Sequence, residues 1–270
     1  MAERMNNLNG KEWLQESFSI WRDIRKSSEE RKIKHPAMFP VQLCEKLIKI
    51  YTKNDGDIIL DPFMGIGSTL VAAKNLNKKG IGIDLNPEFF KITKQRISQQ
   101  QTTLTNNPSI LFKSELYLGD AKEELKKIPD ESIDLCINSP PYWDILNRKR
   151  TVDKKNTRNY SKLKEDVGNI SEYKDFLKEL KNIYSEVYRT LKVDKRCCVI
   201  VMDIRKKSKF YPLHIDITRI MEEIGFELEE FVIWDRQHEY NNMKTLGYPW
   251  VFRFNKVHEF VCIFWKRTKK

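Results

Sequence analysis

The residues whose chemistry is easiest to interpret form one short run, Asp61-Pro-Phe-Met-Gly65-Ile-Gly67-Ser-Thr69. The run follows a short apolar stretch and precedes a segment typical of a helix, so it predicts a strand, a tight turn and a helix. Glycines permit such a turn and let a ligand approach the backbone, at the edge where parallel sheets bind nucleotides. Asp84 ends the next predicted strand, 19 residues after Gly65, a spacing that places a carboxylate on ribose hydroxyls. These residues indicate a site for a nucleoside-containing cofactor.

Two common nucleotide motifs do not fit this run. It lacks the third glycine of the dinucleotide fingerprint and has no Gly-Lys-Ser/Thr sequence, which argues against NAD and against an ATP-binding phosphate loop. Asp120 ends a further predicted strand. Acidic residues at the ends of successive strands favour a ligand site over an ordinary strand-to-helix turn.

Cysteines and histidines do not indicate a metal or redox site. The five cysteines have no C-x-x-C spacing and lie mostly in apolar runs, so we expect reduced core residues. They are Cys44, Cys136, Cys197, Cys198 and Cys262. The four histidines share no metal-ligand spacing with a cysteine or an acidic residue. We therefore predict no metal.

Several segments, in a consistent order, resemble the amino-methyltransferases that use S-adenosylmethionine to methylate exocyclic amines of DNA bases. Asp61–Thr69 is similar to their cofactor motif, Gly82–Phe89 to their ribose-binding strand end, and Gly119–Ala121 to their adenine-binding turn. His35-Pro-Ala-Met-Phe-Pro40 resembles their His-Pro-x-x-x-Pro segment, and Asn138-Ser-Pro-Pro-Tyr142 resembles their catalytic motif. The resemblance implies S-adenosylmethionine as cofactor, bound by His35, Pro36, Phe39, Pro40, Asp61, Pro62, Phe63, Gly65, Gly67, Ser68, Thr69, Asp84, Leu85, Asp120 and Ala121.

The same resemblance implies that Ser139, Pro140, Pro141 and Tyr142 are catalytic, and the chemistry suits these residue types. A base amine is conjugated with its ring, so it becomes nucleophilic only when acceptors bind its protons. The Ser139 hydroxyl and the Pro140 carbonyl supply acceptors, and the two prolines keep the turn rigid. The Tyr142 ring offers a face for a base swung out of the duplex. The amine would then attack the sulfonium methyl directly, without a covalent enzyme intermediate.

The base that is methylated depends on the first motif residue. In the resembled family, Ser-Pro-Pro-Tyr is found mainly in cytosine-N4 enzymes, which favours N4 of cytosine in double-stranded DNA. Adenine N6 is the alternative, because an acceptor suited to one amine serves the other. Carbon-5 methylation requires a cysteine nucleophile, which follows a proline in those enzymes, and no cysteine here does. The fold is also compatible with a catalytically inactive nucleic-acid-binding protein and with an RNA or protein-glutamine methyltransferase.

The elements that must position these residues alternate between helix and strand. Periodicity predicts helices over about 41–51, 68–76, 87–98, 121–127, 171–191 and 212–225, and strands over about 57–61, 80–84, 115–118, 132–138, 197–202, 227–234 and 258–265. The alternation predicts an α/β fold with a mostly parallel sheet and a closing antiparallel pair. The resemblance implies a Rossmann-like class I methyltransferase fold of seven strands, with residues 1–270 as a single domain. Trp13, Phe18 and Trp21 are spaced for one helix face, so we expect them to pack in the core.

Charge and composition point to a polyanionic partner. Lysine and arginine number 49 against 38 aspartates and glutamates, a formal net charge of +11. Two regions that carry basic side chains, 143–170 and 235–256, are our candidate inserted loops for recognising the DNA target. We expect a cognate restriction endonuclease as partner, in restriction–modification. Residues 1–10 show no secretory signal, and no apolar run reaches about 18 residues, so we expect a cytoplasmic protein without a membrane span.

Overall fold

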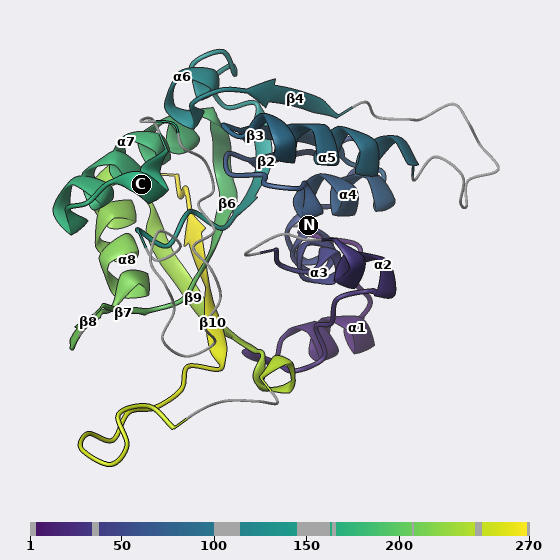
Figure 1. The fold of residues 1–270 in the computed structure, drawn as a ribbon. Helices are drawn as coiled ribbons and strands as arrows, with labels where there is room; N and C mark the ends of the chain where they lie inside the picture. The colour runs from purple at the N-terminus through teal and green to yellow at the C-terminus, as the bar shows by residue number, and fades with distance from the viewer. Residues whose placement is uncertain are drawn as a thin grey trace.

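A central eight-stranded sheet with helices on both faces forms the protein in the computed structural model, which describes residues 4–33, 38–99, 114–144, 163, 166–206, 208–240 and 245–268 (Figure 1). The strand order is β1-β9-β10-β6-β5-β2-β3-β4. The strands are β1 (Ile20–Trp21), β2 (Ile58–Asp61), β3 (Lys79–Asp84), β4 (Glu115–Leu118), β5 (Ile133–Asn138), β6 (Leu191–Val201), β9 (Glu227–Asp235) and β10 (His258–Trp265). Only β10 runs against its neighbours in this sheet. The predicted α/β class, with a mostly parallel sheet and a closing antiparallel pair, is confirmed.

The strand count differs from the expected seven. Strand β1 has two residues and pairs in parallel with β9, matching Ile20 to Ile233 and Trp21 to Trp234. A separate hairpin, β7 (Ile204–Lys206) with β8 (Lys209–Tyr211), follows β6. Segments this short carry no periodic signal, so only tertiary pairing reveals them.

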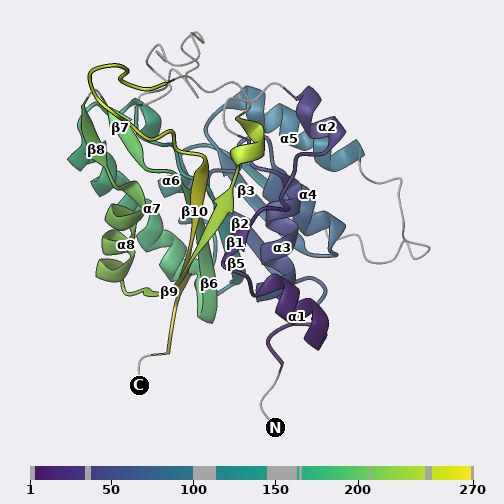
Figure 2. The same ribbon diagram turned by 90° about the horizontal axis from the view of Figure 1, so that it is seen from below.

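Helices cover the sheet in two layers, and Figure 2 shows the sheet between them. One layer holds α3 (Val41–Tyr51), α4 (Ser68–Asn75) and α5 (Pro87–Gln99), and the other holds α6 (Ala121–Leu125), α7 (Tyr173–Thr190) and α8 (Leu213–Ile224). No helix in the described ranges has the length and apolar character needed to cross a membrane. Successive strand side chains point to opposite layers. Adjacent Cys197 and Cys198 therefore lie in different core clusters.

The N-terminal segment does not pack as expected. Helix α1 (Gly10–Glu16) has no buried residue, and it is held at its start by an Asn9–Glu12 capping box rather than by core contacts. Trp13 and Phe18 are exposed, whereas Trp21 is buried on strand β1. The chain leaves the helix before Trp21, so the three aromatic residues never share one helix face. A second short helix, α2 (Ser28–Lys32), follows.

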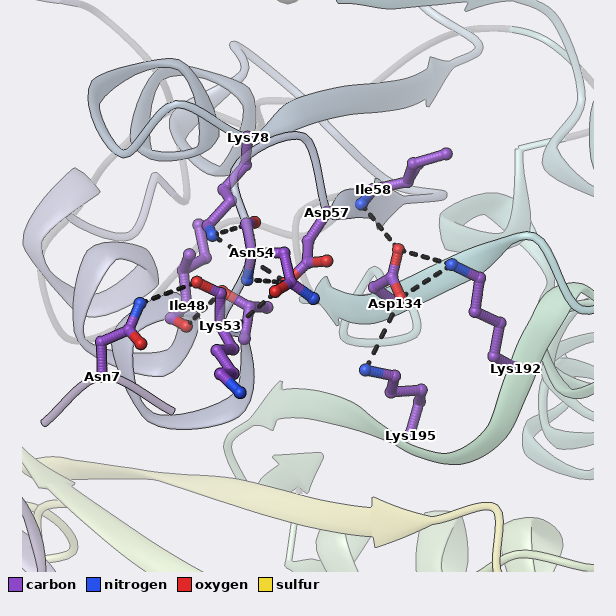
Figure 3. A network of polar contacts seen from close by, with 11 residues as sticks. Asn7, Ile48, Lys53, Asn54, Asp57, Ile58, Lys78, Asp134, Lys192 and Lys195 are labelled. Atoms are coloured by element: carbon purple, nitrogen blue, oxygen red, sulfur yellow. Dashed lines mark hydrogen bonds and ion pairs between the residues drawn. The ribbon is translucent and has the colours of Figure 1, made fainter. Parts of the chain in front are cut away.

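A polar network links the amino ends of β2, β5 and β6 (Figure 3). Asp57 accepts hydrogen bonds from the backbone N–H groups of Lys53 and Asn54 at 3.0 and 2.9 Å. Asp134 accepts from the Ile58 N–H at 3.0 Å and from Lys192 Nζ at 2.8 Å. Both carboxylates are buried, so these partners offset their desolvation. The carboxyl ends of these strands, at the opposite edge of the sheet, remain available for a ligand.

Candidate functional site

A pocket lies where β2, β3, β4 and β5 end, in agreement with the general position of ligand sites in parallel sheets. Counting its open mouth, it encloses about 870 Å³ of empty space. Nine of the predicted cofactor residues line it: Phe39, Pro62, Phe63, Gly65, Ser68, Asp84, Leu85, Asp120 and Ala121. The predicted catalytic residues Ser139 and Pro141 line the same pocket.

Other predicted cofactor residues shape the pocket without lining it. Asp61 is fully buried, and its carboxylate accepts hydrogen bonds from Thr69 Oγ1 at 2.6 Å and from the Phe63 N–H at 3.0 Å. Burial raises the pKa of the Asp61 carboxyl to about 7, and these two hydrogen bonds oppose the rise. Pro40 precedes α3 as its N-cap. The hydrogen bonds of Asp61 with Thr69 and with the Phe63 N–H therefore stabilise the strand-to-helix turn from its buried side. His35 and Pro36 lie outside the described residues.

The two glycines of the turn serve backbone geometry. Gly65 and Gly67 adopt φ values of 52° and 79°, which side-chain-bearing residues rarely adopt. A Cβ on Gly67 would lie 2.5 Å from Thr93 Cγ2 of α5. Gly67 is therefore required by helix packing, whereas Gly65 also faces the pocket and donates its N–H to Asp84 at 2.8 Å.

Asp84 presents a preorganised acceptor. Its Oδ2 accepts from the Gly65 N–H and its Oδ1 accepts from the Asn86 N–H, at 2.8 and 2.7 Å. Each carboxylate oxygen retains further acceptor capacity, and the residue lines the pocket. Burial raises the pKa of the Asp84 carboxyl to about 7, opposed by the two backbone hydrogen bonds. The carboxyl group is therefore held in one orientation, and its pKa of about 7 means that it ionises near neutral pH.

The pocket lining fits a nucleoside-containing cofactor. Phe39, Phe63 and Phe89 give it aromatic walls, beside the acceptor Asp84. The Oγ atom of Ser68, at the first position of α4, is buried and has no hydrogen-bond partner within the described part of the chain. A buried hydroxyl without a partner is costly. A polar group of a bound ligand would form that missing hydrogen bond. The pocket thus combines apolar walls with polar groups that are able to bind a ligand.

The catalytic turn begins at the end of β5, beside the middle of the sheet. Asn138 is fully buried, and its Oδ1 accepts from the Tyr184 hydroxyl at 2.9 Å. Ser139 Oγ donates to the Tyr142 hydroxyl at 3.2 Å. Pro140 is buried and does not line the pocket. The structure therefore brings the Ser139 hydroxyl to the cofactor pocket and fixes the residues on either side of it.

Two residues that the sequence analysis did not single out as catalytic hold Tyr142. The Tyr142 hydroxyl lies 2.8 Å from Glu259 Oε2 and 3.4 Å from the Ile200 carbonyl. Glu259 is buried and forms an ion pair with Arg236. Arg236 also lies 2.5 Å from Glu239. The sequence held one signal for Glu259, since it is the only acidic residue in the apolar strand His258–Trp265.

Several described residues of the 143–170 segment are buried, among them Trp143, Asp166 and Val167. Trp143 donates its indole N–H to the Ile170 carbonyl at 2.9 Å and packs edge-on against Tyr173. Asp166 and Val167 line the cofactor pocket. This contribution could not be predicted, because Asp166 and Val167 lie far along the chain from the catalytic turn and belong to no motif. Residues 145–162 and 164–165 lie outside the described residues.

All five cysteines are buried and unpaired, as expected. Burial is the main cause that raises the pKa values of the Cys44, Cys136 and Cys198 thiols well above their ordinary range, which suppresses thiolate formation. Across the described ranges, no cluster of three or more His, Cys, Asp or Glu side chains is arranged to hold a metal ion.

Comparison with known proteins gives matches to DNA methylases. A family model described as DNA methylase (N6_N4_Mtase) matches residues 2–95 and 133–270, which include both the Gly65–Gly67 turn and Ser139–Tyr142. The Type II methyltransferase M2.LlaDCHI of Lactococcus lactis subsp. cremoris is 43% identical over 84 residues, 31% of this chain and 31% of that protein. The match thus spans about a third of the relative's own length.

A solved structure shares the fold. A precorrin 8W decarboxylase from Methanobacterium thermoautotrophicum superposes with a TM-score of 0.52 at 15% identity, over 89% of this chain and 95% of that chain. A Thermus thermophilus protein, titled as a candidate DNA modification methylase and complexed with S-adenosyl-L-methionine, matches with a TM-score of 0.40 at 25% identity. That match covers 56% of this chain and 52% of the other.

Proposed function

The chain belongs to the DNA methylase family of N6- and N4-amino methyltransferases, which use S-adenosylmethionine, and we propose that it methylates N4 of cytosine in double-stranded DNA. The observation that carries the proposal is that Ser139 and Pro141 line the same pocket as Gly65, Ser68 and Asp84. Methyl transfer requires the acceptor amine and the methyl donor to meet without intervening water. A shared pocket satisfies that requirement.

In this proposal Asp84 accepts hydrogen bonds from ribose hydroxyls, the aromatic walls hold adenine, and Ser68 binds a polar group of the cofactor. When bound, S-adenosylmethionine supplies a methyl group on a positively charged sulfur. Ser139 Oγ and the Pro140 carbonyl accept hydrogen bonds from the two N–H groups of the substrate amine, which draws its lone pair out of conjugation. Tyr142 provides a stacking face for the flipped base. The partly buried turn holds these groups in position before the substrate arrives.

The choice of cytosine N4 over adenine N6 rests on Ser139 standing first in the motif. Adenine N6 is the second candidate, because the same acceptors can bind either amine. Burial and the raised thiol pKa values of Cys44, Cys136 and Cys198 argue against a cysteine nucleophile and therefore against carbon-5 methylation. We propose that the biological role is restriction–modification, with a cognate endonuclease as partner.

DNA recognition is assigned to the 143–170 and 235–256 segments, and the described part of the second segment supports this. Strand β9 has the same direction as β6 and β5, because β10 runs antiparallel to both β9 and β6. The connection from Asp235 to His258 therefore leaves the sheet at the same edge as Asn138. Figure 1 shows its yellow part projecting away from the sheet. A projection beside the catalytic turn suits contact with a duplex.

Residues 245–257, here called the β9–β10 arm, combine exposed aromatic rings with cations. Four aromatic side chains of the arm are between 79% and 88% exposed: Tyr248, Trp250, Phe252 and Phe254. Arg253 and Lys256 lie among them, and the arm contains no acidic residue. Aromatic rings stack on bases or wedge between base steps, and cations bind phosphates. Arg236, which lies within the predicted recognition segment 235–256, is held by Glu239 and Glu259.

The first test is nucleoside mass spectrometry of unmethylated plasmid DNA after incubation with the protein and S-adenosylmethionine. N4-methylcytosine is the expected product. N6-methyladenine would overturn the base assignment and retain the mechanism. No methylated base, with normal cofactor binding, would refute DNA methylation and favour the inactive binding protein; methylation of structured RNA in competition with duplex DNA would favour the RNA enzyme.

The role of the arm is tested by replacing Trp250 and Phe252 with alanine. We expect DNA affinity to fall about tenfold or more, with cofactor affinity and thermal stability unchanged. Phe18→Ala is the matched control, because Phe18 is an exposed aromatic residue outside the arm. Equal DNA affinity in all three proteins would contradict the assignment, as would a change of oligomeric state confined to the arm variant.

A further inference from the structure

We propose that Glu259, held by Arg236, is a positioning residue that acts through Tyr142 to aim the lone pairs of Ser139 Oγ at the substrate amine. The inference rests on the proposed amino-methylation and concerns how its acceptor is oriented. A serine hydroxyl can donate or accept a hydrogen bond. Only the accepting orientation activates an amine, so something in the site must select it.

The selection begins at the Glu259 carboxylate. Glu259 is buried and ion-paired with Arg236, and an ionised carboxylate only accepts hydrogen bonds. Tyr142 therefore donates its single hydroxyl proton to Glu259 Oε2, 2.8 Å away. The Ile200 carbonyl, at 3.4 Å, is a weaker competitor for that proton.

The orientation of the Tyr142 hydroxyl in turn sets the direction of the hydrogen bond between Tyr142 and Ser139. Because the Tyr142 proton points at Glu259, the Tyr142 oxygen offers only lone pairs to Ser139. Ser139 Oγ, at 3.2 Å, accordingly donates its proton to Tyr142. With that proton committed, the remaining electron density of Ser139 Oγ is that of an acceptor. Ser139 lines the cofactor pocket, so this acceptor is presented where the amine must meet the methyl group.

Arg236 determines which carboxylate oxygen of Glu259 accepts the hydrogen bond from Tyr142. It pairs with Glu259 Oε1 while Tyr142 binds Oε2. The guanidinium also lies 2.5 Å from Glu239 and over the Trp234 ring at 4.7 Å. Arginine has no acceptor, so any group opposite it must present oxygen. That restriction makes a substitution at Glu259 unusually informative.

Glu259→Gln preserves the shape of the side chain and reverses the hydrogen-bond direction. Arg236 requires the amide oxygen, which leaves the amide NH₂ facing Tyr142. The Tyr142 hydroxyl must then accept from Gln, and its own proton turns to Ser139 Oγ at 3.2 Å or to the Ile200 carbonyl at 3.4 Å, so the Ser139 proton is no longer held away from the amine. We expect the single-turnover rate of DNA methylation to fall about tenfold or more, with cofactor and DNA affinities within about twofold of the parent.

The decisive measurement is a double-mutant cycle between Glu259→Gln and Tyr142→Phe. Phenylalanine at position 142 has no hydroxyl and so breaks the hydrogen-bonded series from Glu259 to Ser139. We therefore expect Glu259→Gln to change the rate by less than about twofold in the Tyr142→Phe background. The cycle with Ser139→Ala should behave in the same way. Tyr173→Phe is the matched control, because Tyr173 also donates to a carboxylate, Asp216 Oδ2, at 2.8 Å, yet no hydrogen bond in the described part of the chain links it to Ser139. Its effect should multiply with that of Glu259→Gln.

The outcomes separate the inference from the proposed function. If the parent protein methylates DNA and the Tyr142 and Glu259 effects multiply, Glu259 does not act through Tyr142 and the inference is overturned. It is likewise overturned if Glu259→Gln retains the parental rate, because filling space would then suffice. A parent protein that methylates no nucleic acid refutes the proposed function itself.

Discussion

Binding of the nucleoside part of the cofactor should strengthen as the pH rises through about 7, and Asp84 is the reason. Burial raises the pKa of its carboxyl to about 7, and the N–H groups of Asn86 and Gly65 limit that rise. Ribose hydroxyls donate hydrogen bonds, which stabilise the charged carboxylate over the neutral acid. Ligand binding therefore lowers this pKa, and by linkage the affinity increases with pH until the free protein is ionised.

The magnitude follows from the fraction ionised. With a pKa of about 7, about one tenth of the Asp84 carboxyls are charged at about pH 6 and about nine tenths at about pH 8, so affinity should rise about tenfold across this interval. Asp84→Asn removes the titration and keeps the side-chain shape. Its affinity should be low and independent of pH over the same range.

Calorimetry with adenosine is the suitable assay, because adenosine carries the ribose hydroxyls and has no group that titrates near neutral pH. The amino group of S-adenosylmethionine would titrate in this range and obscure the result. A flat profile in the parent protein would refute the ribose assignment. A slope that survives in Asp84→Asn would assign the titration elsewhere, and Asp61, whose pKa burial also raises to about 7, is then the first group to replace.

Three further outcomes follow from the same site. Ser139→Ala should reduce turnover by about 100-fold or more while leaving cofactor affinity near the parental value; equal loss of both in rate and binding assays would make the turn structural. Because burial raises the pKa of Asp61 to about 7, its folded state favours the proton, so its contribution to the free energy of unfolding is complete below the unfolded pKa near 4 and is lost as pH rises through about 7. Urea unfolding at about pH 5 and pH 8 should show this loss, and Asp61→Asn should reduce it, leaving the part due to Asp84, whose pKa burial also raises to about 7. Gly67→Ala should destabilise the fold by about 1–3 kcal/mol, because φ is 79° and the new Cβ would lie 2.5 Å from Thr93 Cγ2; an unchanged urea midpoint would contradict the packing argument.

Sequence periodicity predicted most of the architecture because most helices and strands are long enough to show a repeating pattern of apolar residues. The strands Glu115–Leu118 and His258–Trp265 have the predicted bounds, and the predicted helix 87–98 is Pro87–Gln99 in the structure. Such segments follow from local backbone preference and from the alternation of apolar side chains. The Gly65 turn was identified from its own residues at a strand end, whereas the Ser139 turn was identified through its resemblance to the catalytic motif of the DNA amino-methyltransferases.

The tertiary structure alone decided which of those residues meet the pocket and what holds them. Asp61 and Thr69 belong to the motif yet lie beneath the turn, because the packing of α4 and β2 buries them together. Tyr142 and Glu259 are 117 positions apart and meet only because β10 enters the sheet beside β6. A sequence records the conformational preference of each segment. Contacts between distant segments depend on how all the segments pack together, and no local pattern encodes that arrangement.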